Sequence, residues 1–181
     1  MSQPTVRGRK LPLQDWEGDD PLPVRNKTCM DSAAGRALAY ATNGAVVLDG
    51  KQIRAAVIPR DTDGITMTQA SQAIHSLTGR EIVQHRDWST AEIKTHLRYA
   101  RGLIVIGMYS AIPREYRHQP AADFAHAMWV SHLSAQSGNV RVWDPLNPRI
   151  REYGAWIPLK VILDFLATLD NQCGYIPLET L

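Results

Sequence analysis

Cys29 is the residue of this sequence best placed to act as a nucleophile. It follows Thr28, and Asp31 lies three residues after Thr28, a spacing typical of the capped start of a helix. Small and apolar residues then recur at helical spacing as far as Ala41. A cysteine in a first helical turn lies beside backbone N–H groups and the positive helix end, which favour the reactive thiolate. The alternative is that Cys29 is simply a small core residue of an alanine-rich helix.

A thiolate nucleophile needs a nearby base, and the sequence contains six histidines. Two of them, His126 and His132, lie on one face of an expected strand, because their positions differ by an even number. The other four have no acid at a telling spacing, and we expect them to be surface or structurally satisfied residues: His75, His85, His96 and His118.

Asp144 is the acid that strand pairing brings closest to one of these histidines. A polar turn separates the histidine strand from a second strand, which ends at Asp144. If Leu133 pairs with Asn139, then Asp144 becomes a diagonal neighbour of His126 on the same face, with Cβ atoms about 7 Å apart. A shift of one residue would move Asp144 to the other face. Alternatively, Asp144 only caps the turn before the following proline.

The elements that must position these residues are marked by periodicity, capping patterns and turn residues. Their order, rich in helices first and in strands second, predicts an α+β fold. We expect a helix from Met30 to Ala41, a hairpin turn at Asp49-Gly50, helices from about Thr68 to Leu77 and after Ser89, a central strand at Leu103–Met108, strands over 125–133 and 139–143, and a last helix starting near Pro158.

Composition and charge exclude several classes of protein. The chain has 181 residues, 44% of them hydrophobic and 21% charged, with a net charge of +2. This is ordinary globular composition, without the basic stripe of a nucleic-acid binder or an apolar run long enough for a membrane span. The start lacks the apolar core of a signal peptide. Cys29 and Cys173 make no disulfide framework or zinc motif, so we expect a cytoplasmic protein without metal or cofactor.

Residues 1–27 are expected to form an extended arm, and residues 28–181 the folded domain. Prolines interrupt the arm, and a basic patch (Arg7, Arg9, Lys10) precedes an acidic one (Asp15, Glu17, Asp19, Asp20). The arm is either a flexible leader or a segment that docks on a protein partner. In the second case its anchors would be Leu11, Leu13 and Trp16.

The order of these motifs resembles that of papain-fold cysteine peptidases. The resemblance is to the C39-like branch, which comprises the bacteriocin-processing leader peptidases and their phage and bacterial relatives, and it covers roughly residues 24–169. The matching pieces are Thr28-Cys29 with its helix, the helix ending at Gly79, the capped helix from Ser89 to Gly102, the strand LIVIGM, His126-Ala-Met-Trp-Val, Val142-Trp143-Asp144-Pro145, and the closing Trp156-Ile-Pro-Leu with its helix.

The resemblance implies a papain-like fold, with N-terminal helices packed on a mostly antiparallel sheet, and hydrolysis of a peptide or amide bond. Cys29 would be the nucleophile, His126 the general base and then acid, and Asp144 the group that orients His126. The backbone N–H of Cys29 would supply part of an oxyanion hole. A peptide or protein substrate is implied, and no metal or other cofactor.

Two departures from the family pattern leave a second function open. The family usually carries a Gln about six residues before the cysteine, where this chain has Pro23, so Asn26 or Gln14 would have to donate to the oxyanion instead. Many relatives have Gly after the cysteine, where Met30 would crowd the cleft. The alternative is therefore an inactive papain-like module in a larger assembly such as a phage virion, with residues 1–28 as its docking arm.

Overall fold

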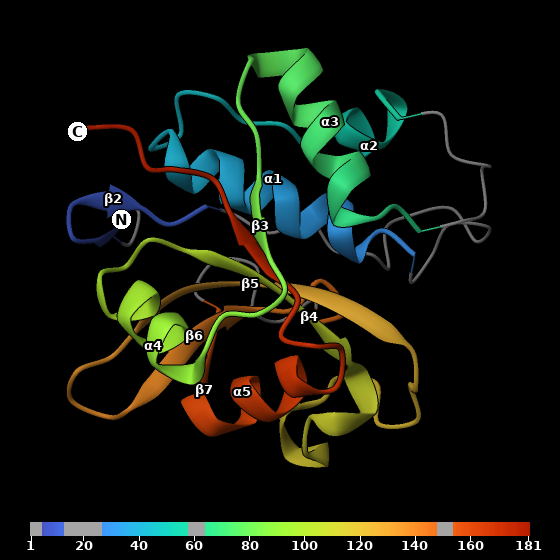
Figure 1. Ribbon diagram of the computed structural model, residues 1–181, viewed down its shortest axis with the longest axis vertical. Coiled ribbons are helices and arrows are strands. Elements are labelled where there is room, and N and C mark those ends of the chain that lie inside the picture. Colours follow the sequence, from blue (N-terminus) through green and yellow to red (C-terminus); the bar gives the residue numbers. More distant parts are fainter. Residues whose placement is uncertain (1–4, 13–26, 58–63, 148–153) are drawn as a thin grey trace.

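Helices cover both faces of an antiparallel sheet in the computed structural model, which describes residues 5–12, 27–57, 64–147 and 154–181 (Figure 1). The helices α1 to α3 lie on one face and α4 and α5 on the other, which confirms the α+β prediction. Their bounds are α1 (Cys29–Ala41), α2 (Gly50–Ala55), α3 (Met67–Thr78), α4 (Thr90–Arg98) and α5 (Leu159–Ala167), with two 3₁₀ turns at η2 (Tyr109–Ala111) and η3 (Arg114–Tyr116).

The main sheet has six strands in the order β3-β8-β4-β5-β6-β7, and each neighbouring pair is antiparallel. The strands β4 to β7 are consecutive in the chain and form a meander. The bounds are β3 (Val83–His85), β4 (Leu103–Met108), β5 (Ala125–Leu133), β6 (Asn139–Trp143), β7 (Ala155–Pro158) and β8 (Cys173–Tyr175). A separate two-stranded hairpin consists of β1 (Thr5–Val6) and β2 (Arg9–Lys10).

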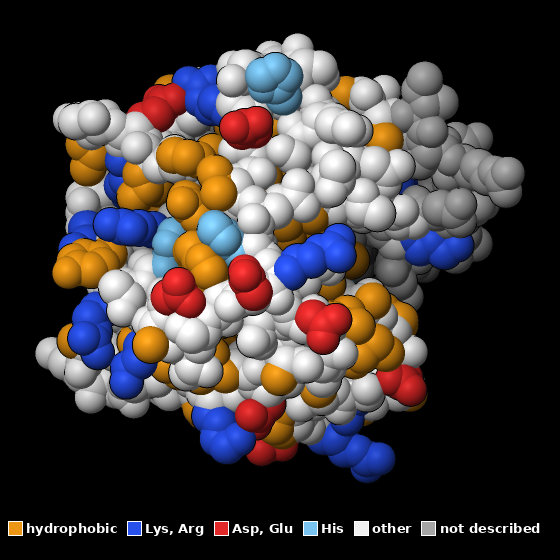
Figure 2. Space-filling model, in the orientation of Figure 1, with side chains coloured by type: hydrophobic (Ala, Val, Ile, Leu, Met, Phe, Trp, Pro, Cys, Tyr) orange, Lys and Arg blue, Asp and Glu red, His pale blue; other side chains and the backbone are white. Residues whose placement is uncertain are grey.

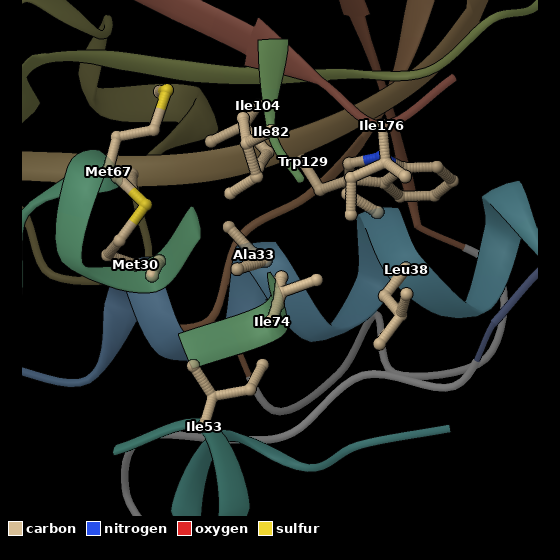
Figure 3. Close-up of a cluster of buried hydrophobic side chains, with 14 of the residues drawn as sticks. Met30, Ala33, Leu38, Ile53, Met67, Ile74, Ile82, Ile104, Trp129 and Ile176 are labelled. Atoms are coloured by element: carbon tan, nitrogen blue, oxygen red, sulfur yellow. The ribbon is translucent and has the colours of Figure 1, made fainter. Parts of the chain in front are cut away.

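Two hydrophobic clusters, one on each face, hold the helices on the sheet. Residues of β5 contribute to both in alternation: Trp129 belongs to the cluster under α1 and α3, whereas Val130 belongs to the cluster under α5. Figure 3 shows the first cluster, in which Met30 and Leu38 of α1 and Ile74 of α3 lie among side chains from the strands. In the described ranges, no helix has the length and apolar character needed to cross a membrane.

Three helices begin with reciprocal side-chain caps, among them the helix after Ser89, but α1 does not. The side chains of Asp49, Thr66 and Ser89 each accept a hydrogen bond from the backbone three residues later. Thr28 occupies the N-cap position of α1 without any side-chain capping bond, so the capping prediction was wrong. Its ψ angle of 13° lies outside the extended region in which an N-cap side chain reaches the first turn.

The expected hairpin turn at Asp49-Gly50 is also wrong, because these residues start α2. Asp49 accepts from the backbone of Gln52, and the Gln52 side chain bonds back to the Asp49 backbone. This capping box outweighs the turn preference of the Asp-Gly pair. A side chain at Gly50 would meet Asp31 at 3.3 Å, so glycine allows α2 to lie close to the start of α1.

The described part of the N-terminal arm packs on the domain itself. The Arg9 guanidinium donates to the carbonyls of Tyr40 and Ala41 at the end of α1, and also to the Glu179 carbonyl. Leu11 is 1% exposed and belongs to the first hydrophobic cluster. Leu11 is therefore a core residue here rather than an anchor for a partner, whereas Leu13 and Trp16 lie outside the described residues.

The register of β5 against β6 changes along the pair. Val130 lies opposite Val142, which is the expected register, but Leu133 lies opposite Val140 and not Asn139. An irregularity between Val130 and Leu133 absorbs the difference. The predicted pairing was therefore wrong near the turn and correct toward the other end of the strands.

Gly107 of β4 lies directly opposite His126 and allows α5 to approach the sheet. A Cβ atom there would meet the Phe165 carbonyl oxygen at 2.1 Å. We expect Gly107→Ala to destabilise the fold by about 3 kcal/mol or more, because the helix backbone would have to move. Gly138→Ala, at a positive φ but in open space, should cost only about 1–2 kcal/mol. Equal losses in urea unfolding would contradict this account.

Candidate active site

His126 and Asp144 form a buried, hydrogen-bonded pair at one end of the sheet. His126 is the second residue of β5, and Asp144 directly follows the last residue of β6. The imidazole Nε2 lies 2.7 Å from the Asp144 Oδ1. Both side chains are buried. The structure thus brings together the histidine and the acid that strand pairing singled out from the sequence.

Asp144 is held by further donors. The Tyr109 hydroxyl donates to Oδ2 at 2.7 Å, and the Leu146 backbone N–H donates to Oδ1 at 2.9 Å. Burial alone would raise the pKa of Asp144, but the charge of His126 and these hydrogen bonds hold it below its ordinary value. The carboxylate is therefore ionised at neutral pH, in an orientation fixed through both of its oxygens.

His126 is poised in its protonated form next to Cys29. Burial alone would lower the pKa of His126, but the Asp144 carboxylate and then the Cys29 thiol raise it well above its usual 6.5. Nε2 is taken by Asp144, and the buried Nδ1 has no hydrogen-bond partner of standard geometry among the described residues. Nδ1 is thus the ring nitrogen available to the thiol.

Cys29 is the first residue of α1, and its side chain is partly exposed. Helix α1 packs against β5, which places its N-terminal end beside His126. As the first residue of the helix, Cys29 has a backbone N–H that the helix does not use, and this N–H has no acceptor among the described residues. Substrate can therefore reach the sulfur from solvent, while the two groups behind it are buried.

Tyr109 is the residue of this site that sequence reasoning missed. It follows β4 directly, and the edge of its ring contacts His126 at a centroid distance of 4.8 Å. Its hydroxyl accepts a hydrogen bond from the His118 backbone while it donates to Asp144. The one available signal was a tyrosine at the end of an apolar strand, next to the strand that carries His126.

The other residues considered from the sequence lie elsewhere. Met30 is 4% exposed and packs in the core, so the expectation that it crowds the cleft was wrong (Figure 3). Both oxyanion candidates, Asn26 and Gln14, lie outside the described residues, as does Pro23. His132 contacts Trp156 near the far end of β5. Over the described ranges, no group of three or more His, Cys, Asp and Glu side chains could hold a metal ion.

Comparison with known proteins places the fold. No family model matches this chain, and no curated protein matches it. Among solved structures, a candidate C39-like peptidase from Bacillus anthracis superimposes with a TM-score of 0.59 at 11% identity, covering 98% of this chain and 96% of that one. The fold is the papain-like fold of the C39-like peptidases.

A second papain-like relative in structure is UfSP from C. elegans, with a TM-score of 0.54 and 13% identity. That similarity covers 93% of this chain but 33% of the UfSP chain. At these identities the similarity establishes the papain-like fold alone. The chemistry of the site depends on this chain's own residues.

Replacing Tyr109 by Phe should remove the hydrogen bond from its hydroxyl to the Asp144 carboxylate. We expect a loss of about 1–3 kcal/mol in urea unfolding, because a buried carboxylate loses a donor. The matched control is Tyr40→Phe, where an equally buried hydroxyl donates to the neutral carbonyl of Ala100. Only Tyr109→Phe should also change the pH dependence of Cys29 alkylation. An identical pH profile for the two variants would refute the positioning role.

Proposed function

We propose that this protein is a thiol hydrolase that cleaves a peptide or related amide bond through Cys29. The observation that carries the proposal is the spatial arrangement of three side chains. The partly exposed Cys29 thiol lies at a helix start, the buried His126 imidazole lies beside it, and the buried Asp144 carboxylate lies behind the imidazole. This is the order required for a thiol to become a nucleophile at neutral pH. The papain-like fold supports the proposal without establishing the activity.

In the proposed first half-reaction, the proton of the Cys29 thiol resides on His126 Nδ1, so that a thiolate lies beside an imidazolium. Asp144 stabilises the imidazolium that results, and the sulfur attacks the carbonyl carbon of the substrate. The tetrahedral oxyanion collapses when His126 returns the proton to the leaving nitrogen. The C–N bond then breaks, the amine departs, and an acyl thioester remains on Cys29.

The second half-reaction regenerates the thiol. A water molecule gives one proton to His126 and attacks the thioester carbonyl. The C–S bond breaks, the carboxylic acid product leaves, and the sulfur receives the proton from His126. Asp144 remains ionised throughout, which agrees with a pKa held below its ordinary value.

The developing oxyanion needs preorganised donors. The Cys29 backbone N–H is one candidate, because the start of α1 provides N–H groups that the helix itself does not use. We propose the side-chain amide of Asn26 or Gln14 as the second donor. The non-catalytic alternative, a structural module, requires that one of these groups is missing or that Cys29 does not react.

Alkylation should separate the two cysteines. Burial and the charge of Asp87 raise the pKa of Cys173 to about 12, which leaves about one thiolate in 100,000 at pH 7. Cys29 is partly exposed and lies beside a protonated imidazole, so iodoacetamide should modify it much faster, as read by mass spectrometry of the folded protein. Equal rates for the two thiols would favour the structural module.

Turnover itself should depend on Cys29 and on the second oxyanion donor. With a mixture of fluorogenic peptide amides as substrate, Cys29→Ala should abolish hydrolysis without lowering the melting temperature. Asn26→Ala and Gln14→Ala, tested separately, identify the donor by a loss of about 100- to 1,000-fold in kcat. If Cys29→Ala hydrolyses the same amides as well as the original protein, the thiol mechanism is excluded.

Replacing Asp144 by Asn should lower the pKa of His126. The Asp144 charge is what offsets burial, so without it the imidazolium is lost at lower pH. The alkaline limb of kcat/KM should therefore move to lower pH, with a rate loss of at least about tenfold at neutral pH. The control is Asp164→Asn, which removes an exposed carboxylate that pairs with Lys160. This variant should leave the pH profile of kcat/KM unchanged. An unmoved alkaline limb in Asp144→Asn would show that Asp144 does not tune the base.

A further inference from the structure

A surface remote from Cys29 combines arginines with an exposed aromatic ring where the β1–β2 hairpin meets the end of α4. Tyr99 is 51% exposed, and the guanidinium groups of Arg7 and Arg101 lie over its ring at 5.7 and 5.3 Å from the centroid. Arg7 also donates to the Arg98 carbonyl at 3.0 Å. Figure 2 shows Lys and Arg side chains gathered along the left side of the molecule, over the hairpin and the end of α4.

A second exposed ring extends this surface along the sheet. Trp156 of β7 is 46% exposed, with the Arg141 guanidinium 5.7 Å from its ring centroid and the His132 ring in edge contact at 5.2 Å. Burial, followed by the charges of Arg141 and Arg7, lowers the pKa of His132 to about 4. His132 is therefore neutral at pH 7. The charges of both Arg141 and Arg7 act on it, which connects the two aromatic groups into one surface.

This arginine–aromatic surface consists of Arg7, Tyr99, Arg101, His132, Arg141 and Trp156. It is separate from the candidate active site. His132 lies six residues after His126 on β5, which corresponds to about 20 Å along the strand. A ligand on this surface is thus distinct from a group that reacts at Cys29.

No carboxylate of the described residues neutralises the charge on the Tyr99 side of the surface. The ion pairs of the described residues join Asp31, Glu179, Asp144 and Asp164 to other cations. Among the described residues, neither Arg7 nor Arg101 pairs with a carboxylate. Their guanidinium groups are instead held over the Tyr99 ring, which reduces the conformational entropy they lose when they bind an anion.

We propose that the arginine–aromatic surface is a docking site for an acidic peptide segment of a substrate or partner protein. Guanidinium groups bind carboxylates in a bidentate geometry, and those of Arg7 and Arg101 have no carboxylate partner in the part of the chain that the structure describes. The proposal does not depend on the chemistry proposed for Cys29, because docking needs only the surface.

A single-stranded nucleic acid fits this surface less well. Its bases would stack on open aromatic faces, but guanidinium groups already lie over the rings of Tyr99 and Trp156. The net charge of +2 is also small for a protein that neutralises a run of phosphates. Carboxylates that approach the guanidinium edges would leave the ring contacts in place.

Fluorescence anisotropy of a labelled peptide of alternating Glu and Gly tests the proposal. The protein carries Cys29→Ala, so that the probe cannot be cleaved. We expect binding that weakens as salt rises, and a loss of about 5- to 10-fold in affinity for the double variant Arg7→Gln, Arg101→Gln. The control Lys51→Gln, Arg114→Gln removes the same charge from exposed positions on α2 and η3 and should bind like the parent.

The single variant Arg101→Glu tests the surface without disturbing the hairpin, because the Arg101 side chain makes no hydrogen bond to another described residue. It should weaken binding at an unchanged melting temperature. The proposal is overturned if the peptide does not bind, or if the arginine variants and the control bind equally. Tighter binding of oligothymidylate or of phosphatidylserine vesicles than of the peptide would assign the surface to nucleic acid or membrane instead.

Discussion

The buried hydrogen bond between His126 and Asp144 is the interaction on which the rest of the site depends. A carboxylate out of contact with water is costly unless its charge is matched and its oxygens are satisfied. Here Asp144 meets both conditions through His126, Tyr109 and the Leu146 backbone. The contacts that offset the cost of burying this carboxylate also fix the orientation of the imidazole toward Cys29. The same hydrogen bonds therefore stabilise the fold and orient His126 for proton transfer.

Antiparallel pairing explains why these groups meet. The end of β4, the start of β5 and the end of β6 lie at the same end of the sheet, because neighbouring strands run in opposite directions. Tyr109, His126 and Asp144 occupy these three positions. The thiol comes from the helical layer, on a helix whose residues 30–41 are all buried. Because α1 packs against β5, one interface aligns the thiol with the other groups.

Local signals in the sequence predicted the elements that carry the site. The features that the sequence did not predict depend on short strands and on contacts between distant residues. The helix at Cys29 is periodic, strand β4 is a continuous apolar run, and turn residues bound β5 and β6. The irregularity in β5 lies beyond the residues that place His126. Strands β3, β7 and β8 have three or four residues, too few for a period to show. Tyr109 could not be assigned, because its partner Asp144 is distant in sequence and becomes its neighbour only through the sheet.

Strand β8 is the last strand in chain order, yet it lies between β3 and β4. The pairing of Val83 with Tyr175 joins segments about ninety residues apart, whereas β4 to β7 pair with successive neighbours. Closing a long loop costs more entropy than closing a short one, and distant contacts form later. During synthesis on the ribosome, the meander that carries His126 and Asp144 is thus able to assemble early. The sheet becomes continuous from edge to edge only after its final segment has emerged.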